Sequence, residues 1–514
     1  MSRIQGFANA DATDAHAVRH EAVQHAALGR TGLACSQAGF GCYRVAEGVE
    51  THRSALHGAL AAGINLIDTS TNYADGESET LVGKVLTDGI RSGELQREEI
   101  VVVSKVGYLQ GRNYALSQDR KAQGRPFPDL VPYAEGLEHC IHPAFIQDQL
   151  ARSRERLNLA TVDVYLLHNP EYYLSWASAQ GIAGTEARAE YDRRLLAAFR
   201  CLEAEADRGH IRYYGISSNT FPASAQREDY TCLERVLELA DALGNGNRLA
   251  VIQFPMNLLE CEAVLTANQP SGATLLEAAR RADVGTLVNR PLNAIGPEGL
   301  LRLADVSKPR LPTVAEIEQA LQALAASEAS LTVDLLPNLS VPVEVRTRIQ
   351  EQVRLAAALR QHYQEFTSYD AWRRIRDTHL WPRVKGVLDY FQRQASSETT
   401  RGWAENHRRI VAEALGAVTA LHAGPAAERA EAMRETIQEA DPDWRGKAPL
   451  SQLAIRALRT TEGISSVLVG MRRPQYVLDV LEELGRPLPP RPHSRAWRQI
   501  RERLASRGII GSSD

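Results

Sequence analysis

The sequence predicts an α/β fold, a (β/α)8 TIM barrel with an all-helical insertion after the seventh strand. Short apolar, β-branched runs of the kind found in buried strands alternate with stretches of helical apolar spacing. Eight such pairs can be counted, and a long stretch with helical periodicity alone separates the last pair from the first seven. Several of the runs end on a polar residue, which in a barrel lies on the face that carries function.

The composition excludes some classes of partner. The chain has 514 residues and a formal net charge of −4, with 24% charged and 44% hydrophobic residues. This balance gives no reason to expect a nucleic acid or a membrane as partner. We recognise no run of membrane-span length and no signal-peptide core. The six cysteines show no metal-ligand spacing, so we expect reduced thiols, no metal and a cytoplasmic protein.

The chain opens with a polar segment of weak pattern. Residues 1–28 are rich in Ala and His and are expected to form a flexible or loosely docked extension. A short glycine-rich strand is expected at 37–42. The helical spacing of 49–62 ends at Gly63, a signal for the end of a helix.

The next two strands each carry an ionisable residue at or near the end. The apolar run 64–67 predicts a buried strand that ends on Asp68, and Tyr73 follows in the next loop. The clearest strand, 99–106, is β-branched and apolar on both faces and carries Lys105. Lysine is rare in this chain, so a lysine at a strand end indicates a functional role.

A long connection with several prolines and glycines, 107–141, comes next and is expected to be functional or mobile. The buried strand 161–168 then ends on His168. Three further strands carry polar residues toward their ends and are expected at 210–219 with Ser217, 249–254 with Gln253, and 284–292 with Asn289.

After this point only helical periodicity is found until a last strand at 463–470. The predicted divisions are an N-terminal extension (1–28), the first part of the barrel (29–300), the helical insertion (301–445), the last part of the barrel (446–486) and a C-terminal tail (487–514).

Each ionisable residue alone also has a purely structural interpretation. Asp68 could cap a turn, Tyr73 could rest on the barrel rim, Lys105 could reach to solvent and His168 could be a core histidine.

Taken together in chain order, however, the segments resemble the aldo-keto reductase superfamily. The matching stretches are Gly-Ile-Asn-Leu-Ile-Asp68-Thr with Tyr73, Ile-Val-Val-Val-Ser-Lys105, Val-Asp-Val-Tyr-Leu-Leu-His168, Ile-Arg-Tyr-Tyr-Gly-Ile-Ser217, Val-Ile-Gln253 and Ile-Ser-Ser-Val-Leu-Val-Gly470. The resemblance covers roughly 28–300 and 446–485.

The resemblance implies a catalytic tetrad of Asp68, Tyr73, Lys105 and His168 in an enzyme that reduces an aldehyde or ketone to an alcohol, or the reverse. Carbonyl reduction places negative charge on oxygen, so a positioned acid must supply a proton. Tyr73 is the implied acid, and a nearby ammonium is expected to lower its pKa from about 10. Asp68 is expected to hold Lys105, and His168 to orient the carbonyl or pass the proton.

The resemblance also implies a nicotinamide dinucleotide, NADP(H) with NAD(H) not excluded, bound without a glycine-rich Rossmann loop. Ser217 and Gln253 match positions that hold the carboxamide. Ser218 stands where the family often has Asn, and the neighbouring Asn219 could substitute for it.

Two further stretches complete the implied cofactor site. After the seventh strand the chain reads Asn289-Arg290-Pro291-Leu292 where the family commonly has an aromatic residue that stacks on the nicotinamide. Arg290 could instead approach a phosphate. The last expected helix of the barrel is preceded by Gly470, Arg472 and Arg473. Their position at the start of a helix predicts that they bind the 2′-phosphate of the cofactor.

Two other functions stay open: a regulatory subunit that binds the nucleotide, and a redox-neutral dehydratase, epimerase or isomerase. The insertion could be a lid over the site, an oligomer interface or a docking module. The sequence predicts a small-molecule substrate but does not identify it.

Overall fold

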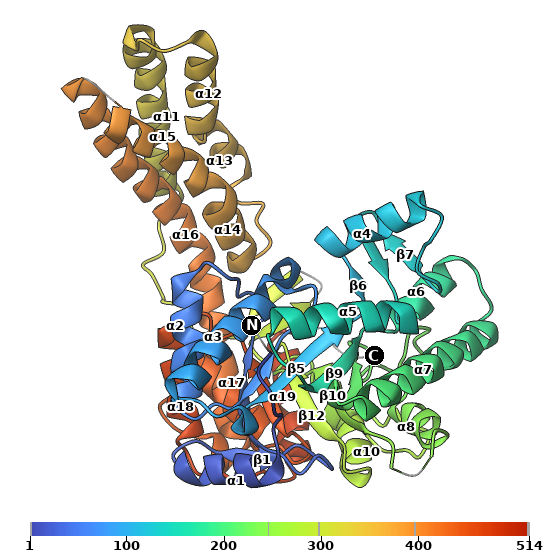
Figure 1. Cartoon of the computed structure of the whole chain (residues 1–514). Coiled ribbons are helices and arrows are strands. Elements are labelled where there is room, and N and C mark those ends of the chain that lie inside the picture. Colours follow the sequence, from blue (N-terminus) through green and yellow to red (C-terminus); the bar gives the residue numbers. More distant parts are fainter. Residues whose placement is uncertain (1–2, 245, 297–298, 395–396, 511–514) are drawn as a thin grey trace. The chain divides into compact units, whose positions relative to one another are not determined.

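The structure is a computed structural model that describes residues 3–244, 246–296, 299–394 and 397–510 (Figure 1). The chain forms two compact units. Met1–Leu292 together with Thr436–Asp514 make the first unit, and Asn293–Glu435 make the second. The second unit corresponds to the insertion predicted at 301–445, with both boundaries upstream of the predicted ones.

The first unit is built on a closed barrel of eight parallel strands, which confirms the predicted fold class. In the order in which they pair around the barrel, the strands are β3 (Ala38–Gly41), β4 (Leu66–Asp68), β5 (Val101–Val106), β9 (Val162–His168), β10 (Ile211–Ser217), β11 (Leu249–Pro255), β12 (Gly285–Asn289) and β15 (Ser466–Val469). The last strand pairs with β12 on one side and with β3 on the other, so the barrel closes across the insertion.

Helices follow the strands and surround the barrel (Figure 1). They are α2 (Glu50–Ala61), α3 (Glu77–Ser92), α5 (Pro143–Arg156), α6 (Tyr172–Ala179), α7 (Gly184–Asp207), α8 (Leu233–Asp241), α9 (Glu262–Leu265), α10 (Leu275–Arg281), α17 (Leu450–Arg459) and α18 (Pro474–Leu484). The tail forms α19 (Ser494–Ser506), which buries Trp497, Ile500 and Leu504.

The N-terminal segment is firmly packed, contrary to the expectation of a loose extension. It contains α1 (Ala10–Arg19), and strand β1 (His25–Ala27) pairs with β2 (Ala34–Ser36). The backbone N–H of Ala8 donates to Asp163 Oδ1 at 2.7 Å, while Arg97 contacts Asp163 Oδ2 at 2.8 Å. Asp163 and Arg97 are both buried. These buried polar contacts hold the segment on the barrel, although its sequence has no apolar pattern.

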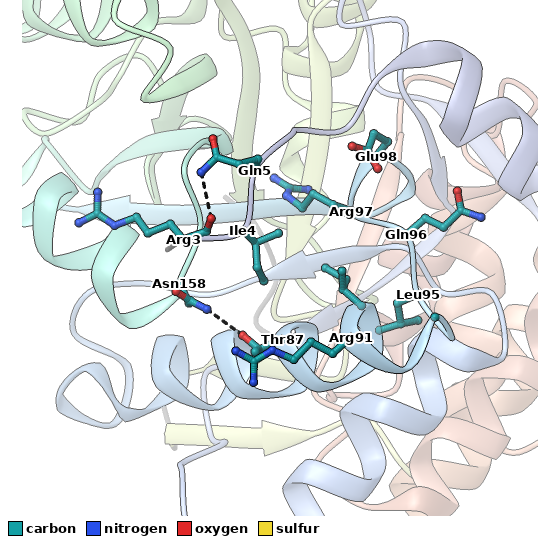
Figure 2. Close-up of a pocket in the computed structure, with 12 residues that line it drawn as sticks. Arg3, Ile4, Gln5, Thr87, Arg91, Leu95, Gln96, Arg97, Glu98 and Asn158 are labelled. Atoms are coloured by element: carbon teal, nitrogen blue, oxygen red, sulfur yellow. Dashed lines mark hydrogen bonds between the residues drawn. The ribbon is translucent and has the colours of Figure 1, made fainter. Parts of the chain in front are cut away.

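The floor of the barrel lies at the amino-terminal ends of the strands. Leu28, Leu33 and Cys35 join the apolar side chains of the strands in one buried cluster. A cavity of about 740 Å³ lies nearby, between the N-terminal segment, the end of α3 and the turn that precedes β5 (Figure 2). Across it Asn158 Nδ2 donates to Thr87 Oγ1 at 3.0 Å. The cavity therefore lies at the opposite end of β5 from Lys105.

The connection 107–141 has a structure of its own. A three-stranded antiparallel sheet combines β6 (Tyr108–Leu109), β8 (Leu137–His139) and β7 (Val131–Ala134), and α4 (Gly111–Ala122) lies between β6 and β7 in the chain. The sheet order is β6-β8-β7. This small subdomain starts directly after β5, and strand pairing places His139 opposite Tyr108.

The second unit is mainly helical and begins with a short hairpin. Its elements are β13 (Asn293–Gly296), β14 (Gly299–Arg302), α11 (Val314–Ser330), α12 (Val343–Val353), α13 (Ala356–His362), α14 (Tyr369–Ile375), α15 (Trp381–Gln394) and most of α16 (Glu398–Ala440), with the short turns η3 (Leu331–Leu335), η4 (Leu336–Asn338) and η5 (Arg376–Leu380). Trp372, Val384 and Leu388 lie in its apolar core.

Helix α16 is the one helix in the described part of the chain whose length and composition would suffice to cross a membrane. This is weak support for a span, because core helices pass the same test. Val411, Leu415 and Val418 of α16 pack in the apolar core of the second unit.

Candidate active site

The carboxyl-terminal ends of six neighbouring barrel strands each carry a polar side chain. The sequence predicted this arrangement: Asp68 ends β4, Lys105 lies at the end of β5, His168 ends β9, Ser217 ends β10, Gln253 lies on β11 and Asn289 ends β12. Strand register places several of them level, since Ser217 pairs with both His168 and Gln253. The predicted site is therefore assembled on one end of the barrel.

Lys105 is the centre of the site. Its Nζ lies 2.7 Å from Asp68 Oδ2, 2.8 Å from the Thr69 carbonyl oxygen and 3.2 Å from Tyr73 Oη. The side chain is fully buried. A buried ammonium is costly unless its three donors are satisfied, and these three oxygens satisfy them.

Tyr73 stands on a tight turn that follows β4. Its backbone N–H donates to the Ser70 carbonyl at 3.2 Å, and the next two residues, Ala74 and Asp75, have φ angles of 47° and 57°. Left-handed conformations cost free energy for residues other than glycine, and such strain gathers at functional sites. The turn brings the phenol over Lys105, with Nζ 4.7 Å from the ring centroid.

The pKa of Tyr73 differs from the expectation drawn from the sequence. Burial raises the pKa of Tyr73 to about 12, and Lys105 only partly offsets this rise. The expectation of a lowered pKa is wrong because it counted the ammonium and not the desolvation of the phenolate. Burial opposes the charge on Lys105 as well, but Asp68 and Tyr73 outweigh it and the pKa of Lys105 is raised. A protonated phenol beside an ammonium is suited to donate a proton.

His168 faces Tyr73 across the site. The two ring centroids are 6.1 Å apart, and Nδ1 of His168 lies 3.2 Å from Ser70 Oγ. Burial, with Lys105 and His139 nearby, holds the pKa of His168 well below its ordinary value, so the imidazole is neutral. Ser70 Oγ also donates to Asn72 Oδ1 at 2.7 Å, so its single hydrogen is already used. Nδ1 of His168 therefore donates to Ser70 Oγ, and Nε2 is the unprotonated nitrogen of the neutral ring.

Gln253 joins the predicted cofactor residues to the tetrad. Its Nε2 donates to Asp68 Oδ1 at 2.8 Å, and its Oε1 accepts from Ser217 Oγ at 3.1 Å and from Asn289 Nδ2 at 3.3 Å. Asn289 Oδ1 is buried without a hydrogen-bond partner. A buried acceptor of this kind is costly to leave unpaired and matches an amide N–H of a ligand.

The sequence profile of the Aldo/keto reductase family matches residues 39–329, more than half of the chain. The chain belongs to the aldo/keto reductase family. It is 28% identical over 206 residues to the NADH-specific methylglyoxal reductase of Escherichia coli, a match that covers 36% of this chain and 53% of that protein. It is 31% identical over 148 residues to a putative voltage-gated potassium channel subunit beta of Schizosaccharomyces pombe, with 28% of this chain and 36% of that protein covered. The chain thus spans about half or less of these curated relatives.

A solved structure of a glycerol dehydrogenase from Gluconobacter oxydans is also similar to this aldo/keto reductase. The match covers 95% of this chain and 97% of that chain, at 16% identity and a TM-score of 0.46.

Several residues predicted for the cofactor in this aldo/keto reductase are already engaged with protein groups. Ser218 Oγ lies 3.2 Å from Thr220 Oγ1, and the Arg290 guanidinium lies 2.6 Å from Glu260 Oε1. Arg290 has a left-handed backbone with a φ of 54°, and its Nε is buried without a partner. The remaining predicted residues are the exposed Asn219, Gly470 and Arg473 and the partly buried Leu292 and Arg472.

Sequence reasoning missed several residues of this aldo/keto reductase site. Ser70 and Glu260 contact predicted residues, His139 contacts the His168 carbonyl oxygen, and Glu171 accepts the Asn219 N–H. Ser70 and Glu171 carried a signal, because they lie two residues after Asp68 and three residues after His168 in the strand-end loops.

Proposed function

We propose that this aldo/keto reductase is an NADP(H)-dependent oxidoreductase that reduces an aldehyde or ketone to an alcohol, or catalyses the reverse. The observation that carries the proposal is the contact of one buried ammonium, Lys105, with both Asp68 and Tyr73. Family membership supports it, and the name of the E. coli relative, an NADH-specific methylglyoxal reductase, supports carbonyl reduction but not the choice of NADPH over NADH.

The side chains have distinct roles in this proposal. Tyr73 Oη donates its proton to the carbonyl oxygen, on which negative charge develops during reduction. Lys105 stabilises the phenolate that is left, and Asp68 holds Lys105 in place and balances its charge. His168, which faces the Tyr73 ring across the site, orients the carbonyl. The dinucleotide, when bound, supplies the hydride.

The residues present fit a nicotinamide carboxamide. This group offers an N–H donor and a carbonyl acceptor, and the buried Oδ1 of Asn289 needs a donor. Gln253 lies beside it on β11 and accepts a hydrogen bond from Ser217 on β10. Arg472 and Arg473 precede α18 and are proposed to hold the 2′-phosphate. Arg290 is not needed for this role, because Glu260 already pairs with it.

The direct test uses the purified full-length chain. Titration with NADPH or NADH is expected to change the nucleotide fluorescence, and small aldehydes are expected to be reduced with matching loss of nicotinamide absorbance. Absence of binding for both nucleotides would refute the proposal. Binding without turnover of any aldehyde or ketone would favour the regulatory-subunit function, for which the channel-subunit relative is a precedent in name.

The pH dependence of the two directions is expected to differ. Because the pKa of Tyr73 is about 12, the phenol stays protonated near neutrality. Aldehyde reduction should therefore be nearly flat between about pH 6 and 9, while alcohol oxidation, which needs the phenolate as base, should rise about tenfold per pH unit where proton transfer limits. Steady-state rates in both directions measure this. A reduction rate that falls with a midpoint near pH 7 would contradict it.

A further inference from the structure

The loop after β9 and the loop after β10 are joined by two hydrogen bonds, each donated by a main-chain N–H. The N–H of Asn169 donates to the Ser217 carbonyl at 2.7 Å. The N–H of Asn219 donates to Glu171 Oε1 at 2.8 Å. The first loop begins at catalytic His168, and the second contains the residues proposed to hold the carboxamide. The two contacts therefore fix the two halves of the site against each other.

The loop after β9 is in turn held by residues of the small subdomain that follows β5. Nε2 of His139 lies 2.7 Å from the His168 carbonyl oxygen, and Asn169 Nδ2 donates to Tyr108 Oη. The approach is close, because a Cβ at Gly107 would lie 2.4 Å from the His168 carbonyl oxygen. Since His168 and Asn169 cannot shift easily, Glu171 is attached to a rigid base.

The carboxyl of Glu171 is unusual in its surroundings. The side chain is 2% exposed, and Oε2 is buried without a hydrogen-bond partner. Burial raises the pKa of Glu171 to about 7. The titratable or charged groups that face it are Tyr108, Tyr172, Tyr191 and Asp229, and none of them is a cation. A buried acid without a positive partner costs stability, and such groups concentrate at functional sites.

We propose that Glu171 is a positioning residue that fixes the loop Ser217–Asn219 against His168 and thereby shapes the carboxamide site. This inference rests on the proposed function for its nucleotide part alone. The contact itself is a property of the chain. The Glu171 carboxyl accepts the Asn219 N–H and also interacts with the Ser218 hydroxyl, so its loss should free the second loop.

The chain offers a matched control at the other end of the barrel. Glu203 Oε1 accepts the backbone N–H of Arg248 at 2.7 Å, just before β11 begins. The hydrogen bond is of the same kind as at Glu171, from a backbone N–H to a carboxylate, although Glu203 also pairs with the Arg248 guanidinium at 2.7 Å. The contact lies on the face away from the tetrad. Glu203→Ala should therefore reproduce a general loss of stability without any effect on the loop Ser217–Asn219.

Hydrogen–deuterium exchange on the ligand-free protein tests the contact. In Glu171→Ala the peptide 217–222 is expected to exchange at least about tenfold faster than in the wild type, because a hydrogen bond to a carboxyl group is lost. In Glu171→Gln exchange should stay within about threefold, since the amide oxygen still accepts the Asn219 N–H. Unchanged exchange in Glu171→Ala, a failure of Gln to rescue, or an equal effect in Glu203→Ala overturns the inference.

Nucleotide titration tests the consequence for the site. The Kd for NADPH is expected to rise about tenfold in Glu171→Ala and to stay near the wild-type value in Glu171→Gln and Glu203→Ala. A wild-type Kd in Glu171→Ala overturns the role in shaping the carboxamide site. If the wild type binds neither NADPH nor NADH, the proposed function fails, and the exchange experiment still decides whether Glu171 positions the loop.

Discussion

Replacement of Tyr73 by phenylalanine is expected to lower kcat for carbonyl reduction by about 10²- to 10⁴-fold, the usual contribution of a positioned acid. The variant keeps the ring, which lies edge-on to His168 at 6.1 Å, and removes only the hydroxyl that Lys105 contacts at 3.2 Å. The barrel should therefore fold, and the Kd for NADPH should stay within about threefold. Stopped-flow or steady-state rates with a good aldehyde measure the effect.

The matched control for this variant is Tyr213→Phe. Tyr213 Oη donates to the Thr31 carbonyl at 3.1 Å, on the floor of the same barrel. This variant also loses one phenolic hydrogen bond, but at the end of the strands away from the tetrad. It should keep wild-type kcat. Equal rates for wild type and Tyr73→Phe would show that Tyr73 is not the acid.

The largest expected effect on stability comes from Glu483→Gln. The Glu483 carboxylate lies 2.7 Å from Arg456 Nη2 and 2.8 Å from Arg459 Nη2. All three side chains are at most 1% exposed. Removal of the negative charge leaves two guanidinium groups buried without a counter-charge. Breaking a buried ion pair in this way costs about 3–5 kcal/mol in the free energy of unfolding.

Urea unfolding followed by tryptophan fluorescence measures this loss, because Trp444 and Trp497 lie beside the end of α17 and donate to Thr460 and Thr461. The neighbouring Glu482→Gln is the control. Glu482 is exposed, so its replacement should change the free energy of unfolding by less than about 0.5 kcal/mol. If Glu483→Gln cost no more than Glu482→Gln, the buried cluster would contribute nothing to stability.

The parts of the fold and site that could be predicted from the sequence are those with a local signal. A run such as 99–106 is β-branched on both faces, and Lys105 at its end is visible without any knowledge of its partners. The order of Asp68, Lys105 and His168 at successive strand ends then indicates one site, because parallel strands present the same end to the same face.

The parts that could not be predicted depend on contacts between residues distant in the chain. The hydrogen bond from Gln253 to Asp68 crosses the barrel, and the hydrogen bond from the Ala8 N–H to Asp163 joins the N-terminal segment to β9. Neither leaves a periodic pattern. The raised pKa of Tyr73 depends on how completely the phenol is desolvated, which composition and spacing do not report.

The position of β15 has a consequence for synthesis of the chain. Seven barrel strands leave the ribosome before the insertion, and the strand that joins β12 to β3 follows only after it. At about 5–20 residues per second, the intervening chain takes roughly 10–30 s to make. During this time β3 and β12 each have an unpaired edge, and exposed edges invite pairing with other chains.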